Sequence, residues 1–170
     1  MKKILFIYLI FLFNNVALSA IKENIINNLE NTRNLSFDFE QNINGKIETG
    51  KYNAANEKVL ISNGRTFVIK TKSSYYQYSI KRTPLDYILD KKFLINEIKF
   101  MEERVVDNKF INFTILKDDN EINIFFDKDN YNLIGWQTLD IYQNLSITYL
   151  SSIKNNELIN KNIFKLPSAN

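Results

Sequence analysis

Acidic side chains that could do chemistry occur together at two places in the chain. "EER" at Glu102–Arg104 places two carboxylates next to each other, which an acid–base pair could use. "DKDNYN", beginning at Asp127, alternates carboxylates like the start of a calcium loop, but it lacks the central glycine, and Thr138 stands where the final glutamate ligand belongs. Neighbours on a strand point apart, and short polar runs usually form turns. We interpret the first stretch as a solvated edge and the second as a hairpin turn.

Other catalytic chemistry is limited by what the sequence omits. The chain has no histidine and no cysteine, which removes most nucleophile–base pairs and most transition-metal sites. We therefore expect no catalytic residue, no metal site and no cofactor, so the protein is not expected to be an enzyme. The formal net charge is only +3, and it falls by two if Lys2 and Lys3 are removed, so nothing favours a nucleic-acid partner.

The amino-terminal stretch "MKKILFIYLIFLFNNVALSA" has the layout of a secretory signal peptide. Two lysines precede the apolar run Ile4–Phe13, and small residues follow at Ala17 and Ser19. The run is shorter than the roughly 20 apolar residues that a transmembrane helix needs. We expect residues 1–20 to be a cleaved signal, although a retained anchor is the alternative. Residues 21–170 would then form a single exported domain that relies on its core because it has no disulfides.

Two segments are predicted to be helical. Ile21–Arg33 carries apolar residues at helical spacing. "TPLDYILD" starts with Thr83, which can cap a helix, and Pro84, which suits the first helical position. The side chains expected to face the rest of the protein from these helices are Ile25, Leu29, Leu85, Ile88 and Leu89.

Most of the remaining sequence is typical of antiparallel strands separated by turns. "NLSFDFEQNINGKIETGKYN", from Asn34, alternates apolar and polar side chains, and "VLISNGRTFVIK" is typical of a hairpin turning at Asn63-Gly64. "NEIKFMEERVVDN", from Asn96, is expected to be mostly extended. The other predicted strands are "SSYYQYSI", "KFINFTILK", "EINIFFD", "NLIGWQTLD" and "LSITYLSS".

This pattern predicts an α+β fold with one curved antiparallel sheet, a half or open β-barrel of about nine to ten strands covered by short helices. Such a sheet offers more apolar surface than two short helices cover tightly, so a hydrophobic cavity with the helices as a lid is expected. For any one aromatic residue, ordinary core packing remains the alternative. The candidate cavity residues are Leu35, Phe37, Phe39, Phe67, Ile69, Phe113, Phe125 and Trp136.

Several of these stretches together resemble the LolA family of periplasmic lipoprotein carriers. "SFDFEQNINGKIETGKY" is similar to the family's first strand pair, "VLISNGRTFVIK" to its hairpin, and "TPLDYILD" to its Thr-Pro-Leu helix start. The closing block "LIGWQTLDIYQNLSITYLSSIKNNELINKNIFKLP" matches in the order and spacing of its residues. The family has a longer segment where Asn53–Asn56 stands here; its functional arginine and a nearby phenylalanine lie in that segment, so neither role is transferred to Arg65 or Arg82.

The resemblance implies a monomeric carrier in the periplasm of a Gram-negative bacterium. Its partners would be acylated lipoproteins, the inner-membrane ABC transporter that releases them, and the outer-membrane receptor that accepts them. Two other functions stay open: a periplasmic lipid- or acyl-binding protein outside lipoprotein traffic, and a structural relative whose cavity has closed.

Overall fold

The computed structural model describes residues 20–55, 58–62, 67–70, 75–78, 89–117 and 119–164. Between residues 58 and 78 it describes the backbone of three strands. Residues 1–19 of the predicted signal peptide, the Asn63-Gly64 turn, and the side chains of Leu85 and Ile88 lie outside the described residues.

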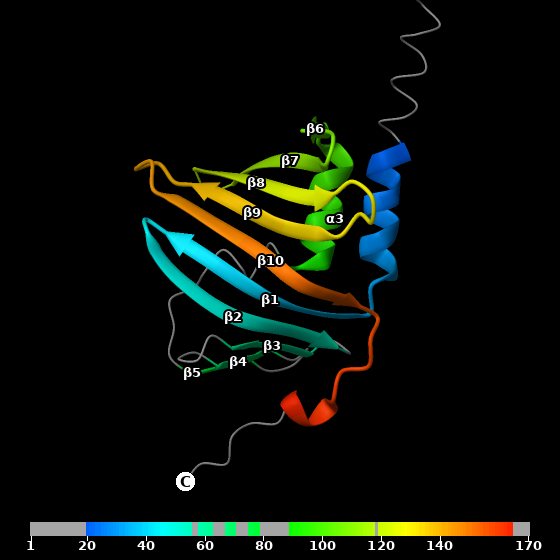
Figure 1. Cartoon of the computed structure of the whole chain (residues 1–170), viewed down its shortest axis with the longest axis vertical. Helices are drawn as coiled ribbons and strands as arrows, with labels where there is room; N and C mark the ends of the chain where they lie inside the picture. Colours follow the sequence, from blue (N-terminus) through cyan, green and yellow to red (C-terminus); the bar gives the residue numbers. More distant parts are fainter. Residues whose placement is uncertain are drawn as a thin grey trace, which may run out of the picture.

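The described strands form one antiparallel, ten-stranded sheet, as the sequence predicted (Figure 1). Their order across the sheet is β5-β4-β3-β2-β1-β10-β9-β8-β7-β6, so the edge strands β5 and β6 do not meet and the sheet stays open. The first five strands are β1 (Asn34–Ile43), β2 (Lys46–Ala55), β3 (Lys58–Ser62), β4 (Phe67–Lys70) and β5 (Tyr75–Tyr78). The others are β6 (Arg104–Val106), β7 (Phe110–Lys117), β8 (Asn120–Asp127), β9 (Leu133–Leu139) and β10 (Leu145–Asn155).

The turn between β1 and β2 shows how the sequence sets the register of the sheet. Asn44 and Gly45 have φ of 50° and 86°, the positive values that a two-residue type I′ turn needs at both central positions. The amide of Gly45 also donates to Asn42 Oδ1 at 2.8 Å. This turn pairs Phe37 with Tyr52, and their rings stack with centroids 4.7 Å apart.

Two helices lie against one face of the sheet within the described part of the chain: residues 20–31 and α3 (Lys91–Phe100) (Figure 1). We call these two the helix pair. The first confirms the predicted amino-terminal helix. A short 3₁₀ helix, η1 (Lys161–Phe164), follows β10 and packs near Ala55.

Helix α3 corrects one prediction. "NEIKFMEERVVDN" was expected to be mostly extended, but residues 96–100 are helical and only Arg104–Val106 forms a strand. The helix begins because the side chain of Asp90 accepts the amides of Lys92 at 2.9 Å and Phe93 at 3.3 Å. Of the predicted helix in "TPLDYILD", residues 83–88 lie outside the described residues, and Asp90 serves as the cap of α3.

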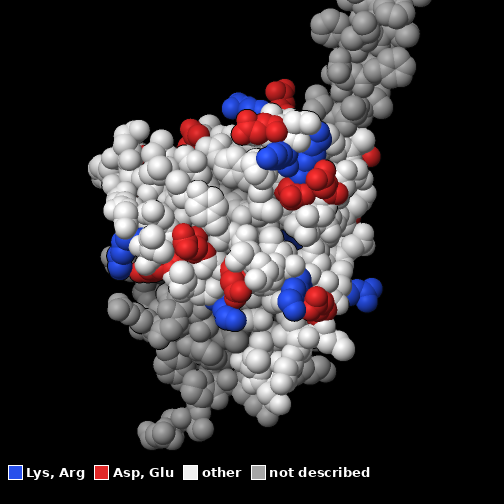
Figure 2. Space-filling model, in the orientation of Figure 1, with Lys and Arg blue, Asp and Glu red and all other residues white. Residues whose placement is uncertain are grey.

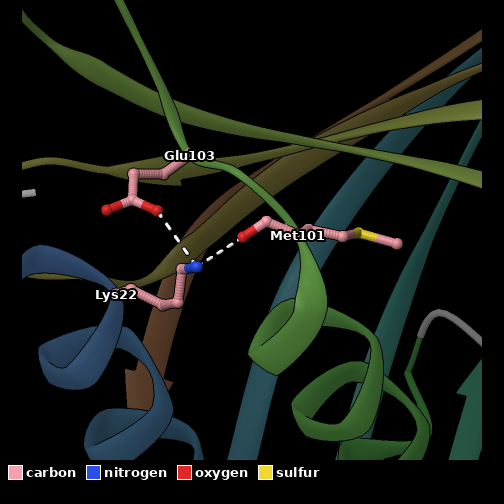
Figure 3. Close-up of polar contacts among 3 residues, drawn as sticks. All are labelled: Lys22, Met101 and Glu103. Atoms are coloured by element: carbon pink, nitrogen blue, oxygen red, sulfur yellow. Dashed lines mark hydrogen bonds and ion pairs between the residues drawn. The ribbon is translucent and has the colours of Figure 1, made fainter. Parts of the chain in front are cut away.

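Each member of the helix pair supplies a lysine that caps the carboxyl end of the other. Lys91 Nζ donates to the carbonyls of Glu30 at 3.3 Å and Thr32 at 3.1 Å. Lys22 Nζ donates to the carbonyl of Met101 and pairs with Glu103 at 3.3 Å (Figure 3). A cation at a helix carboxyl end is favourable because the last carbonyls have no partner and carry partial negative charge. These reciprocal caps make the antiparallel helix pair one unit.

Candidate functional site

Strand pairing shows which side chains face the helix pair. Residues directly opposite each other in an antiparallel ladder point to the same face. Phe113 pairs with Ile124, Ile124 with Trp136, Trp136 with Thr148, and Thr148 with Gln41, so these five form one row across five strands. Because Phe113, Ile124 and Trp136 pack against the helices, this is the helix-bearing face of the sheet.

A dense apolar core fills the space between the helix pair and strands β7 to β9. Phe113 and Phe126 meet edge to face with ring centroids 5.9 Å apart, and both are fully buried. Close packing of this kind leaves no room for a ligand between Phe113 and Phe126. The core residues are Ile25, Leu94, Ile98, Ile111, Phe113, Ile115, Ile122, Ile124, Phe126 and Trp136.

An apolar cavity of about 60 Å³ lies beside this core, where the helix pair passes over β1, β9 and β10. We call it the acyl cavity, after the ligand proposed for it below. Leu29, Leu89 and Leu94 line it from the helical side, and the sheet contributes Leu35, Phe37, Leu133, Leu150 and Ile153. Its polar edge is formed by Asn28, Thr32, Lys91, Asn132 and Asn155.

A second hollow of about 250 Å³ lies near the β1–β2 and β9–β10 turns, and most of its wall area is apolar. We call it the polar hollow after the amide, hydroxyl and carboxylate side chains among its lining residues. Gln41 and Ile43 come from β1, and Thr138 and Ser146 come from β9 and β10. Asn120, Asp140, Asn144 and Leu145 complete the lining of this polar hollow.

One charged group lining the polar hollow has a displaced pKa. Asp140 accepts the side-chain amide of Asn144 at 2.8 Å and the backbone amides of Asn144 at 2.8 Å and Tyr142 at 2.9 Å. These hydrogen bonds hold the pKa of Asp140 below its ordinary value because they favour the charged carboxylate, and the bond from the Asn144 side chain has the largest effect. Asp140 thus orders the β9–β10 turn.

The predicted cavity residues fall into separate places. Leu35, Phe37, Leu29 and Leu89 line the acyl cavity. Phe39 is buried beside Phe37 and Tyr52 in the cluster next to the cavity. Phe113, Trp136 and Ile25 belong to the dense core. The side chains of Phe67, Ile69, Leu85 and Ile88 lie outside the described residues.

Phe125 was wrongly predicted to line the cavity. Its ladder partners are Asn112 and Gly135, while its neighbours Ile124 and Phe126 belong to the core. Alternation along β8 therefore places Phe125 on the opposite face of the sheet.

Sequence reasoning missed cavity residues on β10 and α3. Leu150 and Ile153 alternate imperfectly because β10 is irregular opposite Ser36 and Asp38, and Ser152 has φ of 52°. Leu94 was missed together with α3 itself. The helical spacing of Leu94 and Ile98, with Asp90 as a cap, was the available signal.

In the first acidic stretch Glu102 is exposed, as the solvated-edge interpretation expects, but the side chain of Glu103 is only 7% exposed, which contradicts it; the second stretch forms the expected turn. Glu103 pairs with Lys22, and Asp127 accepts the backbone amides of Asp129 at 2.9 Å and Asn130 at 3.0 Å inside the β8–β9 turn. The face in Figure 2 carries Lys, Arg, Asp and Glu side chains interspersed, with neither sign gathered into one large patch. No helix within the described residues is long and apolar enough to span a membrane.

Comparisons with known proteins show similarity in fold only. No family model matches the chain, and no curated protein matches it. The crystal structure of MucB superposes with a TM-score of 0.55 at 10% identity, covering 90% of this chain and 64% of that one. The MucA/MucB complex of Pseudomonas aeruginosa gives 0.56 at 9% identity, covering 89% and 62%. The chain therefore spans somewhat under two thirds of these relatives.

The alignment with a LolA superfamily protein, NE2245 from Nitrosomonas europaea, covers 88% of this chain and 97% of that chain, at 9% identity and a TM-score of 0.32. That score is too low to carry an argument. The likeness to MucB extends over most of the chain, and at these identities it shows a shared open-sheet fold.

Proposed function

We propose that this protein binds the acyl chains of lipids between the helix pair and the sheet, and that it carries acylated lipoproteins through the periplasm. The observation that carries the proposal is the acyl cavity, an apolar space on the helix-bearing face that is roofed by Leu29, Leu89 and Leu94. Each methylene transferred from water into such a space contributes about 0.8 kcal/mol.

The size of the acyl cavity implies that the helix pair must move during binding. Its volume is about 60 Å³, whereas ligand pockets usually measure about 300–1,000 Å³. An acyl chain would therefore take the place of the leucines that roof the cavity. Contacts between these leucines and the sheet would be exchanged for contacts between the acyl chain and the sheet, so opening with ligand uptake has a small net free energy. This suits a carrier that must also release its cargo.

Polar contacts at the edge of the acyl cavity would hold the closed state without making it permanent. Asn28 Nδ2 donates to the carbonyl of Tyr131 at 2.9 Å and to Asn132 Oδ1 at 3.2 Å, and both loop residues follow β8. Asn24 Nδ2 donates to the Tyr131 hydroxyl at 3.2 Å. Hydrogen bonds at a partly exposed edge are replaced by hydrogen bonds to water when it opens, so their net contribution is small.

The remaining parts of the proposal rest on the sequence's signal-like start and on its resemblance to the LolA family. Residues 21–170 would act as a single exported, monomeric domain, loaded by an inner-membrane ABC transporter and unloaded by an outer-membrane receptor, with no enzymatic activity. A lipid- or acyl-binding protein outside lipoprotein traffic is the alternative that the same cavity supports.

A second candidate function is protein recognition. MucB, whose fold this chain shares, has been crystallised in complex with MucA(peri). MucB in that complex superposes on this chain with a TM-score of 0.51. A role in binding a protein partner would not need the acyl cavity, so a change that fills the cavity separates the two candidates.

The test is to fill the acyl cavity and measure uptake of an apolar fluorescent dye. Leu150→Trp places an indole inside the cavity, and the matched control Tyr149→Trp places one on the opposite face of the same strand, where the native tyrosine is 59% exposed. We expect the control to bind N-phenylnaphthylamine like the wild type and Leu150→Trp to lose at least tenfold in affinity, with both folded by circular dichroism.

Release of a labelled lipoprotein from spheroplasts then separates the carrier from another lipid binder. A carrier converts the label into a soluble complex, and Leu150→Trp does not. Dye uptake without release would leave a lipid binder of another purpose, and a wild type that takes up no dye would refute acyl binding altogether.

A further inference from the structure

Two polar atoms are buried on the helix-bearing face without a hydrogen-bond partner within the described structure: Trp136 Nε1 and Thr148 Oγ1. Trp136 is 2% exposed and Thr148 is 1% exposed. A buried donor that makes no hydrogen bond destabilises the protein that contains it. Valine would occupy nearly the same space as threonine, and an aromatic side chain without a polar atom could replace the indole at the cost of some volume, so the pair calls for an explanation.

The two residues are neighbours across the sheet. Trp136 on β9 and Thr148 on β10 are direct ladder partners, which places their Cβ atoms about 4.5–5.5 Å apart on the same face. Gln41, the partner of Thr148 on the other side, is itself 2% exposed and donates to Ser146 Oγ at 3.3 Å. Trp136, Thr148 and Gln41 thus lie side by side on the helix-bearing face, and we call the first two the polar site.

This polar site lies between the acyl cavity and the polar hollow. Along β10, Leu150 lines the acyl cavity two residues after Thr148, and Ser146 lines the polar hollow two residues before it. Along β9, Thr138 lines the polar hollow two residues after Trp136. A molecule whose apolar part lay in the acyl cavity and whose polar part lay in the hollow would cross this site.

The two side chains define the group that they can bind. The indole N–H only donates a hydrogen bond, and the threonine hydroxyl can donate as well. A carbonyl oxygen has two lone pairs and can accept both hydrogen bonds at once. We propose, resting on the acyl-binding function above, that Trp136 and Thr148 bind the carbonyl oxygen of a fatty-acyl group, whether ester, amide or carboxylate.

The site sets a direction for the bound lipid. Its hydrocarbon tail runs from the carbonyl into the acyl cavity, and its headgroup or peptide end lies in the polar hollow beside Gln41 and Thr138. Hydrogen bonds from Trp136 and Thr148 then make binding selective for acyl compounds over plain hydrocarbons of the same length.

The deciding variant is Thr148→Val, which keeps the shape of the side chain and removes the hydroxyl. We expect it to bind laurate and methyl laurate about three- to tenfold more weakly in dye displacement, because one hydrogen bond to the ligand is lost. Binding of dodecane should be unchanged. Without ligand, its Tm should rise by about 2–4 °C, because an unsatisfied buried group has been removed.

Two further variants control for structure. Thr148→Ser keeps the hydroxyl and should restore binding of both acyl probes. Thr114→Val removes a hydroxyl on the opposite face that donates to Asn123 Oδ1 at 2.7 Å, so its Tm should fall while binding of all three probes stays the same. A general effect of replacing threonine by valine would change the Tm of both variants in the same direction. Opposite changes therefore report on the hydrogen bonding of each hydroxyl.

Three outcomes would overturn the proposal. Equal weakening of laurate and dodecane binding by Thr148→Val would make Thr148 a packing residue. A lower Tm for Thr148→Val would show that the hydroxyl is already hydrogen-bonded in the free protein, for example to a water molecule. Unchanged binding of every probe would refute the carbonyl site while leaving acyl binding intact, whereas a wild type that binds no probe refutes both.

Discussion

Asp140 ties the ends of the β9–β10 turn together through one carboxylate. It accepts three hydrogen bonds from Tyr142 and Asn144, while Gln143 between them has φ of 63°. Asparagine and aspartate stabilise such turns because their side chains replace backbone acceptors. This turn sets the register that places Ser146 opposite Thr138, and both residues line the polar hollow.

The turn is predicted to loosen in acid. Because the pKa of Asp140 is lowered in the folded state, its stabilising effect is fully present above the unfolded pKa and is lost as the pH falls through the folded value. NMR titration should show the carboxyl of Asp140 protonating below an ordinary aspartate, with the amide signals of Tyr142 and Asn144 shifting at the same pH. In Asn144→Ala the pKa of Asp140 should return toward its ordinary value; an unchanged pKa would contradict the assigned cause.

Single residues also show where sequence reasoning succeeds and fails. Leu35, Phe37 and Phe39 alternate with polar neighbours, so their common face was readable from the sequence and is confirmed. Phe125 and Phe126 are adjacent and both apolar, so alternation alone does not say which faces inward. The pairing of Ile124 with Trp136 shows which of the two phenylalanines faces the core. This register depends on β9 as well as β8, so it cannot be read from the β8 segment alone.

At the scale of elements, Gly135 determines how closely β9 and β10 approach. A Cβ on Gly135 would lie 2.3 Å from the carbonyl oxygen of Thr148. The neighbouring β8–β9 ladder is also irregular between Phe125 and Phe126. The strand pairing that holds Thr148 therefore needs a residue without a side chain at this point.

Gly135→Ala is predicted to destabilise the protein by about 1–3 kcal/mol or more, because backbone atoms on β10 must shift to relieve the clash and because the φ of 154° disfavours a side chain. Urea denaturation gives the free energy of unfolding. The matched control is Gly45→Ala, where no atom lies within 4 Å of the added Cβ and only the φ of 86° opposes the change, so a loss of about 1 kcal/mol is expected. Equal losses in the two variants would show that the close approach is not what Gly135 provides.

The elements differ in how well their sequences identify them. The first helix has clear periodicity, strands β7 to β10 are apolar runs separated by turn residues, and those predictions are confirmed. Helix α3 has only three buried residues, Leu94, Ile95 and Ile98, and two of them are β-branched, so its local propensity is weak. Its contacts with the core and its caps stabilise it, and these depend on residues distant in sequence.

At the scale of the whole molecule, the helix pair covers an open sheet as a separate layer. The reciprocal lysine caps join its helices, and Asn28 links it to the loop after β8. The absence of cysteine makes this arrangement convenient to test with introduced thiols.

Linking the helix pair to the sheet is predicted to block acyl uptake. In Asn28→Cys/Asn132→Cys, positions whose native side chains are 3.2 Å apart would be joined by a short thiol-bridging reagent. The linked protein should lose dye and laurate binding, while each single-cysteine variant treated in the same way keeps it. Full binding by the linked protein would show that ligand enters without displacement of the first helix.

The central pairing of β1 with β10 also has a consequence for how the chain folds. Gln41 and Ser146, whose side chains form a hydrogen bond across it, are 105 positions apart in the sequence. Strands β2 to β5 lie on one side of this pairing and strands β9 to β6 on the other. The two half-sheets therefore join only after β10 has been synthesised, near the end of the described chain. Contacts this distant slow folding because a long loop must close before they form. A chain that ends before β10 would leave unpaired strand edges at the middle of the future sheet, where aggregation begins.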